Sequence, residues 1–412
     1  KCSDASSRQQ GLSLVEVMVG MAVGLIATVV IMKSFTASEI FRGNVSGSAD
    51  MLQTASIASA RLGIALEEAG AGMVQGQNVW GCRILGARSG TVLLPRPSTF
   101  AEPFASFPTT VRAMPLAILD GGENSDVLAV MAGGSGASNR GKTLTRGPDY
   151  PGTPEVTFTN TLGFGSKNAG QTVNDLLLVV PIADTLGDCK IVQLASAFSN
   201  GTAVSDLSLG LKLVPAAGLV TSPASYTSTL LNSATYGVVE EALLDFGEPV
   251  AYHLGREESA VFSLFSVNAR GELTELDMLQ RRGTQAIAEN VLLLKARYGV
   301  DNGADGGIAD DNVVDEWIAP TESGWTLATL MNGTKSSAYK AGQIKAVRVG
   351  MILRSTLPVG NDAAITSLSL FADLGESRAH TRSLSATEQR YAYQVYDWVI
   401  PLRNMKSIER AQ

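Results

Sequence analysis

A glycine-rich segment in the first half of the chain matches a phosphate-binding pattern. Gly136, Gly141, Lys142 and Thr143 satisfy the spacing G-x-x-x-x-G-K-T, which cradles phosphate groups when a helix begins at the lysine. The following residues, 144–152, contain glycines and prolines that prevent such a helix. We therefore interpret the match as chance, expect a surface loop there, and expect no nucleotide site.

An acidic segment, residues 301–311, offers oxygen ligands. Asp301, Asp305 and Asp310 are spaced around glycine turns and could hold calcium. The segment departs from the EF-hand pattern, because Gly303 occupies the third position and Asn312 stands where a bidentate glutamate is needed. An acidic hairpin loop is the simpler interpretation. Calcium stays a candidate ligand, and we expect no other cofactor.

The remaining chemistry-bearing residues do not indicate an enzyme. His253 and His380 are the only histidines, too few for a multi-histidine zinc site. The sequence contains no G-x-S-x-G elbow, and no pair of carboxylates has a context that favours acid–base catalysis. A net charge of −7 without a basic stripe argues against nucleic-acid binding.

The sequence contains three cysteines, two of which could form a disulfide. Cys2 precedes the first apolar stretch, which leaves Cys82 and Cys189 in the body of the chain. In an exported protein these two cysteines are expected to form a disulfide. The alternative is a pair of buried free thiols.

Residues 12–32 are apolar apart from one charge, Glu16. A helix of that length is about 31 Å long and crosses a bilayer. Basic residues before it keep the N-terminus cytoplasmic. A secretory signal peptide is the alternative, but the residues that follow, from Lys33 to Phe35, offer no small-x-small cleavage site.

Glu16 is costly inside an apolar span, by about 2.5–3.5 kcal/mol on insertion scales. An ordinary anchor has no use for such a carboxylate. A positive group on a partner would offset the cost, so Glu16 is a candidate functional residue.

The sequence from Gly11 to Val19, G-L-S-L-V-E-V-M-V, resembles the type IV prepilin signature. The resemblance implies that a prepilin peptidase cuts between Gly11 and Leu12 and methylates the new N-terminus. It also makes Glu16 the fifth mature residue, with a role in assembly. Leu12 stands where the family usually has phenylalanine. A plain signal anchor is the alternative.

A second resemblance lies in the C-terminal third. Its segments resemble the PilW family of minor pilins, and that family is similar to the J-type pseudopilins of type II secretion. The segments that carry it are 290–301, Trp317, Trp325, 344–355 and 396–404.

The resemblance implies a function in type IV pilus assembly, in which the protein primes or caps the filament tip. Its implied partners are the prepilin peptidase, other minor pilins, the major pilin, a large PilY-type tip protein and the inner membrane. The implied location is a single-pass anchor in the inner membrane with a periplasmic head, exposed at the pilus tip. The alternatives are a type II secretion pseudopilin and a pilus-associated adhesin or binding module.

We expect an α+β fold with a long N-terminal helix packed on an antiparallel sheet with large insertions. Alanines and a leucine at spacings of three and four predict that residues 34–69 continue the helix with a narrow buried stripe, and that Gly70 and Gly72 end it. The stripe comprises Ala55, Ala58, Leu62, Ala65 and Ala69.

Apolar runs typical of strands fill the rest of the chain. The clearest are 126–131, 155–159, 175–182, 190–194 and 261–267. The run 344–355 alternates only in part and predicts a half-buried antiparallel strand. The expected organisation is a leader at 1–11, a transmembrane helix at 12–33, its amphipathic continuation at 34–69, and a head at 70–412 with an inserted subdomain at about 95–285.

Overall fold

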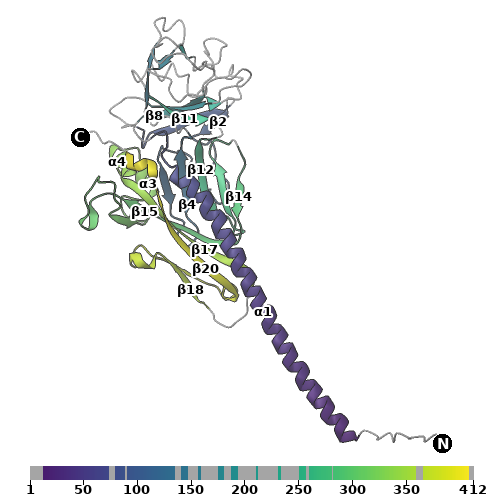
Figure 1. Cartoon of the computed structure of the whole chain (residues 1–412). Helices are drawn as coiled ribbons and strands as arrows, with labels where there is room; N and C mark the ends of the chain where they lie inside the picture. Colours follow the sequence, from purple (N-terminus) through teal and green to yellow (C-terminus); the bar gives the residue numbers. More distant parts are fainter. Residues whose placement is uncertain are drawn as a thin grey trace, which may run out of the picture.

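A long helix projects from one side of a β-rich head and carries the N-terminal end of the chain away from it (Figure 1). We describe residues 13–73, 79–88, 91–134, 141–146, 156–158, 175–180, 187–193, 210–211, 231–232, 250–256, 259–280, 282–358 and 365–407 of the computed structural model. The α+β architecture expected from the sequence is confirmed.

Helix α1 (Leu14–Glu67) runs for 54 residues without interruption. Ser13 caps it, with its side-chain oxygen accepting a hydrogen bond from the backbone N–H of Val15 at 3.3 Å. The predicted stripe packs against the head, and Ala58, Leu62 and Ala65 are fully buried. A single rod therefore connects the apolar segment with the core.

Two glycines redirect the chain after α1. Gly70 and Gly72 have positive φ angles of 78° and 72°, as the sequence predicts for the end of a helix. A side chain at Gly72 would also lie 2.8 Å from the carbonyl oxygen of His253. The backbone N–H of Gly70 donates to Met131 at 2.8 Å, which ties the turn to a strand of the head.

The end of α1 is also held by the C-terminal part of the chain. The side-chain amide of Asn404 donates to the carbonyl oxygen of Glu68 at 3.1 Å and to those of Glu67 and Ala69 at 3.4 Å. Arg403 forms an ion pair with Glu67 at 3.1 Å. These contacts satisfy carbonyl groups that have no partner within the helix.

The core sheet lies directly against α1, mainly through β17 and β20 (Figure 1). Its strands are antiparallel in the order β16-β15-β17-β20. Their bounds are Glu316–Ile318 for β16, Val291–Val300 for β15, Ile344–Pro358 for β17 and Tyr391–Pro401 for β20.

The prediction of a half-buried strand at 344–355 is wrong, because β17 is covered on both faces over most of that run. One face meets α1. A hairpin of β18 (Ser367–Leu370) and β19 (His380–Ser383) lies over the other, where Leu370 and Phe371 pack on Ile352. That cover comes from a later part of the chain, which the pattern of the strand itself does not reveal.

The middle sheet packs beside the core sheet around the C-terminal half of α1 (Figure 1). Its order is β14-β13-β12-β4-β3. The bounds are Gln285–Ala288, Leu273–Asp277, Val261–Val267, Val127–Ala132 and Leu116–Leu119 in that order. Arg61 of α1 forms a 2.6 Å ion pair with Glu275 of β13. Strands β3, β4, β12 and β13 come from within the predicted insertion at about 95–285 and contribute to the core beside α1. The subdomain boundary stays a prediction.

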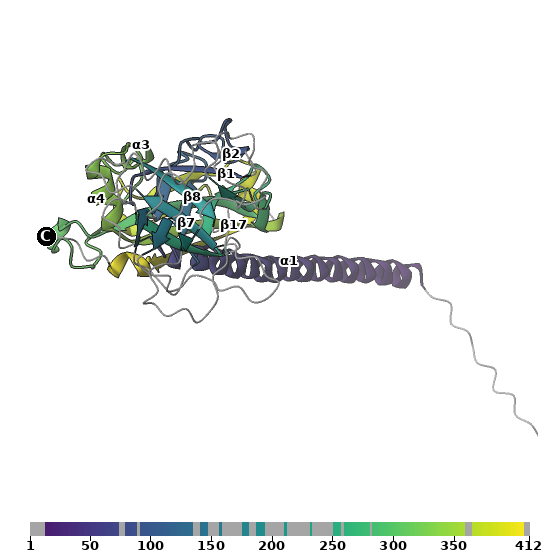
Figure 2. The same ribbon diagram turned by 90° about the horizontal axis from the view of Figure 1, so that it is seen from above.

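The outer sheet lies at the end of the head farthest from the N-terminus (Figure 1), and its strands β7 and β8 face the viewer in Figure 2. Its order is β10-β1-β8-β7-β11-β5-β6-β9, and β2 pairs with β1. The bounds are Arg83–Arg88 (β1), Thr91–Leu94 (β2), Lys142–Arg146 (β5), Val156–Phe158 (β6), Asp175–Val180 (β7), Asp188–Gln193 (β8), Gly210–Leu211 (β9), Leu231–Asn232 (β10) and Val250–Arg256 (β11).

Cys82 and Cys189 form the expected disulfide, with their Cα atoms 5.7 Å apart. Strands β1 and β8 run parallel at this point, and Ile84 lies opposite Cys189. The bridge therefore cross-links two neighbouring strands of the outer sheet.

Two short helices complete the described part of the head. They are α3 (Leu327–Leu330) and α4 (Lys335–Gln343), and α4 begins with a capping box between Thr334 and Ser337. Single 3-10 turns are Ala304–Gly306, Ala372–Leu374, Glu388–Arg390 and Arg403–Ser407.

Candidate assembly interface

The N-terminal part of α1 is an apolar surface that the head does not cover (Figure 1). Residues Leu14–Thr36 are long and apolar enough to cross a membrane, judged by length and composition, and none of that segment is buried. Among the described residues it is the single helix of this kind. Its exposed apolar side chains include Leu14, Met18, Met21, Leu25, Ile26 and Ile31. A surface of this kind is suited to lipid or to other apolar helices.

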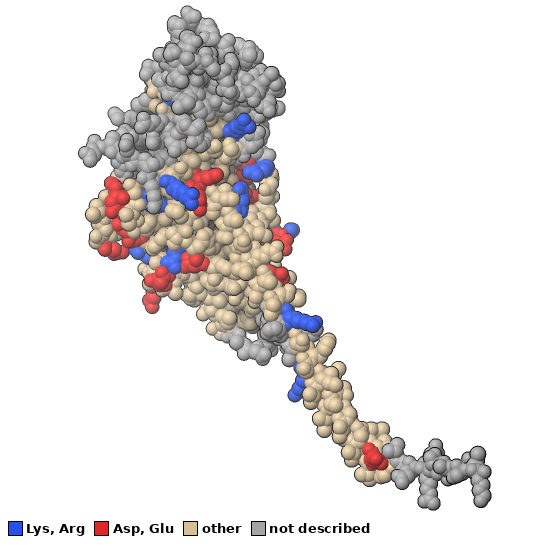
Figure 3. Space-filling model, viewed as in Figure 1, with Lys and Arg blue, Asp and Glu red and all other residues tan. Residues whose placement is uncertain are grey.

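Glu16 lies in the first turn of this segment and is exposed. Its backbone N–H donates to the carbonyl of Ser13 at 2.9 Å. Figure 3 shows the apolar surface of the helix with an acidic group near its N-terminal end. Among the described residues no cation pairs with Glu16. The positive end of the helix dipole favours a carboxylate here, but by less than the cost of placing it in an apolar medium.

Two features of this surface escaped the sequence analysis. Gly20 and Gly24 lie one turn apart, and a Cβ atom added at either would meet nothing within 4 Å. The spacing G-x-x-x-G was the available signal, and it permits close approach of another helix. Further along, Ile57 and Ile64 are about half exposed on the side away from the buried stripe. Their seven-residue spacing marks a second apolar face on α1.

Comparisons with known proteins agree with this geometry. Residues 251–404 match the family model for type IV pilus-assembly protein W. Residues 6–32 match the prokaryotic N-terminal methylation motif. These two matches support a type IV pilus-related pilin whose C-terminal part is similar to the PilW family. No curated protein and no solved structure matches it significantly.

The PilW match spans β11 to β14, the whole core sheet and the segment that reaches Asn404. Families of this kind are structural rather than enzymatic, and membership implies contact with other pilins and with the prepilin-processing machinery. Gly11 and Leu12 fall within the matched motif but outside the described residues. Cleavage between them stays a prediction.

In this pilin, the phosphate-loop pattern does not form a phosphate-binding turn in its described part. Lys142 and Thr143 lie in β5, paired with Ala251 and Val250 of β11, and no helix begins at the lysine. Gly141 precedes the strand, and Gly136 lies outside the described residues. Burial lowers the pKa of Lys142 to about 8.

In the acidic loop, residues 301–311, a side-chain carboxylate binds backbone N–H groups of the same segment. The buried carboxylate of Asp301 accepts hydrogen bonds from the N–H groups of Asp310 and Asn312 at 2.5 and 2.8 Å. Asp305 is exposed in a 3-10 turn. The described residues include no group of three or more histidine, cysteine, aspartate or glutamate side chains that could hold a metal ion. The three aspartates are thus not gathered as a ligand set.

Proposed function

We propose that this protein is a minor pilin of the type IV pilus machinery, which primes or caps the filament tip together with other minor pilins. One observation carries the proposal. A bare apolar helix with Glu16 in its first turn is continuous with the helix that is buried in the head. Such a rod transmits the position of the anchor to the head without a hinge.

The proposal includes a life cycle. A prepilin peptidase cleaves between Gly11 and Leu12 and methylates Leu12, and the helix stays in the inner membrane with the head in the periplasm. There the protein meets other minor pilins, the major pilin and a large PilY-type tip protein. Glu16 pairs with the α-amine of Leu12, in its own chain or in a neighbour, because opposite charges attract strongly at low dielectric.

The size of the head supports a place at the tip. About 340 residues follow α1, and a domain of that size has an expected radius of gyration of about 20 Å, against about 14 Å for a 120-residue domain. Anchor helices pack closely in a filament, so a head this wide would crowd its neighbours along the shaft. At the tip no subunit lies beyond it.

The proposal can be tested with Glu16→Gln, which keeps the size of the side chain and removes its charge. The variant should insert in the membrane and be cleaved normally, but its recovery with other minor pilins should fall at least about tenfold, as expected for a lost low-dielectric charge pair. Lys33→Gln, at the other end of the apolar segment, serves as the control and should behave as wild type. Membrane fractionation, N-terminal mass spectrometry and co-purification give the readouts. Wild-type recovery and normal piliation by Glu16→Gln would refute the assignment.

A further inference from the structure

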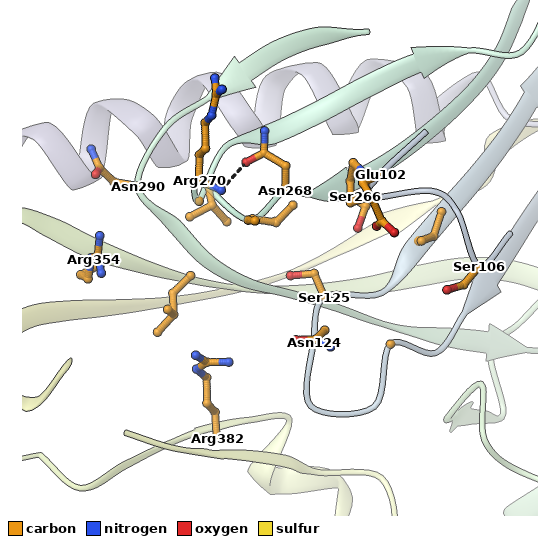
Figure 4. Close-up of a pocket in the computed structure, with 18 of the residues that line it drawn as sticks. Glu102, Ser106, Asn124, Ser125, Ser266, Asn268, Arg270, Asn290, Arg354 and Arg382 are labelled. Atoms are coloured by element: carbon orange, nitrogen blue, oxygen red, sulfur yellow. Dashed lines mark hydrogen bonds between the residues drawn. The ribbon is translucent and has the colours of Figure 1, made fainter. Parts of the chain in front are cut away.

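A polar cleft of about 640 Å³ opens in the head (Figure 4). It lies where the turn between β12 and β13, the loop before β4 and the start of β15 meet the ends of β17 and β19. This volume falls in the range of sites that bind small ligands or a few residues of a peptide.

Three arginines line the cleft. Arg354 comes from the end of β17, Arg382 from β19 and Arg270 from the β12–β13 turn (Figure 4). The guanidinium of Arg354 lies 4.6 Å from the centre of the Tyr391 ring. Among the described residues, neither Arg354 nor Arg270 has a carboxylate partner.

Two hydrogen bonds hold the guanidinium of Arg382 in place, and its Nε–H group remains without an acceptor among the described residues. The guanidinium donates to Glu388 at 2.9 Å and to the carbonyl of Glu123 at 3.4 Å. Its Nε atom is buried and has no acceptor within the described part of the chain. The two contacts of its guanidinium with Glu388 and Glu123 therefore fix the orientation of Arg382 at the cleft.

Glu388 neutralises Arg382, but the acidic residues of the cleft leave Arg354 and Arg270 without a carboxylate partner among the described residues. Glu388 accepts from Arg382 and from the hydroxyl and N–H of Ser385. Asp120 lies 3.5 Å from the buried ammonium of Lys295. Glu102 lies beside Ser266, across the cleft from Arg354 (Figure 4). The guanidinium fork fits a carboxylate in two parallel hydrogen bonds, so the arginine side favours such a group.

A second groove lies next to the cleft. That groove, about 370 Å³ in volume, lies between α1 and β14 and shares Asn290 with the cleft. Asp50 of α1 and Glu289 line it, so its charge is opposite to that of the arginine side. An elongated path with charges of opposite sign at its ends suits an extended chain better than a compact ligand.

We propose that the cleft and the groove together bind an extended peptide segment of a partner protein. A carboxylate side chain of that segment lies between Arg354 and Arg382, and a basic side chain lies over Asp50. This site is separate from the apolar helix, so a failed Glu16 test would leave it unaffected.

The test uses the full-length protein in detergent micelles and a fluorescent hexapeptide with glutamates at one end and a lysine at the other. Anisotropy should show saturable binding that weakens as salt is added. Arg354→Ala should weaken it at least about tenfold, and Arg354→Lys should weaken it as well, because lysine lacks the fork. Arg282→Ala removes an exposed arginine outside the cleft and should change nothing.

Three comparison probes decide the class of ligand. A peptide with glutamine in place of glutamate, free glucuronate and inorganic phosphate should each bind at least about tenfold more weakly than the charged peptide. Equal binding of the glutamine peptide would overturn carboxylate recognition. Equal binding of glucuronate or phosphate would overturn the peptide assignment. If no probe binds the wild-type protein, and thermal unfolding shows that this protein is folded, the site itself is overturned.

Discussion

The buried ion pair between Lys295 and Asp126 joins the core sheet to the middle sheet. The ammonium of Lys295 lies 2.7 Å from the Asp126 carboxylate and donates to the carbonyl of Gly122 at 2.7 Å. Both side chains are at most 1% exposed. Asp126 also accepts from the N–H of Ala296 at 3.0 Å, and its own N–H donates to the carbonyl of Leu294. Each charge is thus compensated, as a buried ion pair requires.

Replacing one member of this pair should leave an uncompensated buried charge. We expect Lys295→Met to lower the free energy of unfolding by about 3–5 kcal/mol. Adding Asp126→Asn should recover part of that loss, so the double variant should be more stable than the sum of the single effects predicts. Lys335→Met, at an exposed position of α4, should change stability by less than about 0.5 kcal/mol. Chemical denaturation in detergent measures the single variants Lys295→Met and Asp126→Asn, the double variant and Lys335→Met. Strict additivity of the two single effects would contradict the coupling.

Single residues differ in how far the sequence predicts their environment. Glu16 was identifiable because its neighbours along the chain are apolar, and Cys82 and Cys189 because few cysteines were left to pair. The burial of Lys295 was not identifiable from the sequence, because a lysine in an apolar run is also typical of a strand with one face in solvent. Its burial depends on Asp126, which is 169 positions away in the sequence.

At the scale of elements, α1 forms from residues that are adjacent in the sequence, but the residue that caps its C-terminal end, Asn404, comes from the far end of the described chain. The side-chain amide of Asn404 holds the last carbonyls of the helix, so Asn404→Ala should destabilise the protein by about 1 kcal/mol. The neighbouring change Arg403→Ala removes an ion pair whose arginine is 70% exposed, and should cost at most about 0.5 kcal/mol. Amide hydrogen exchange of residues 64–69 should become faster in Asn404→Ala and stay unchanged in Arg403→Ala. Equal effects of the two changes would argue against a specific cap.

The elements were predictable where the pattern is local. The helix and its buried stripe follow from the spacing of apolar residues, and the helix ends at Glu67 where the sequence predicted residue 69. The predicted strand at 261–267 has the observed bounds of β12. The prediction for β17 failed because the β18–β19 hairpin covers its second face. The cleft could not be predicted, because Arg270, Arg354 and Arg382 come together only through pairing of distant strands.

For the whole molecule, the disulfide is a covalent cross-link inside the outer sheet, between the start of β1 and β8. The 107 positions it spans correspond to about 4.7 kcal/mol in the chain-entropy model, an upper figure. We expect Cys82→Ser with Cys189→Ser to expose the outer sheet to protease while α1, β17 and β20 stay protected, because none of them contains a bridge residue. Limited proteolysis with peptide mapping checks this, with wild type under reducing and non-reducing conditions for comparison. An unchanged digestion pattern would show that the bridge adds no stability there.

The contact between Asn404 and α1 also sets an order of events during synthesis. The apolar helix leaves the ribosome first, and Asn404 leaves it nearly four hundred residues later. Until that residue has been synthesised, the carbonyl groups at the end of α1 lack its side-chain amide. A nascent or truncated chain therefore holds the end of α1 by fewer contacts than a complete chain, with Arg61 on Glu275 and Gly70 on Met131 among those already formed. Partners that require a fixed angle between helix and head would accept finished subunits and reject incomplete ones.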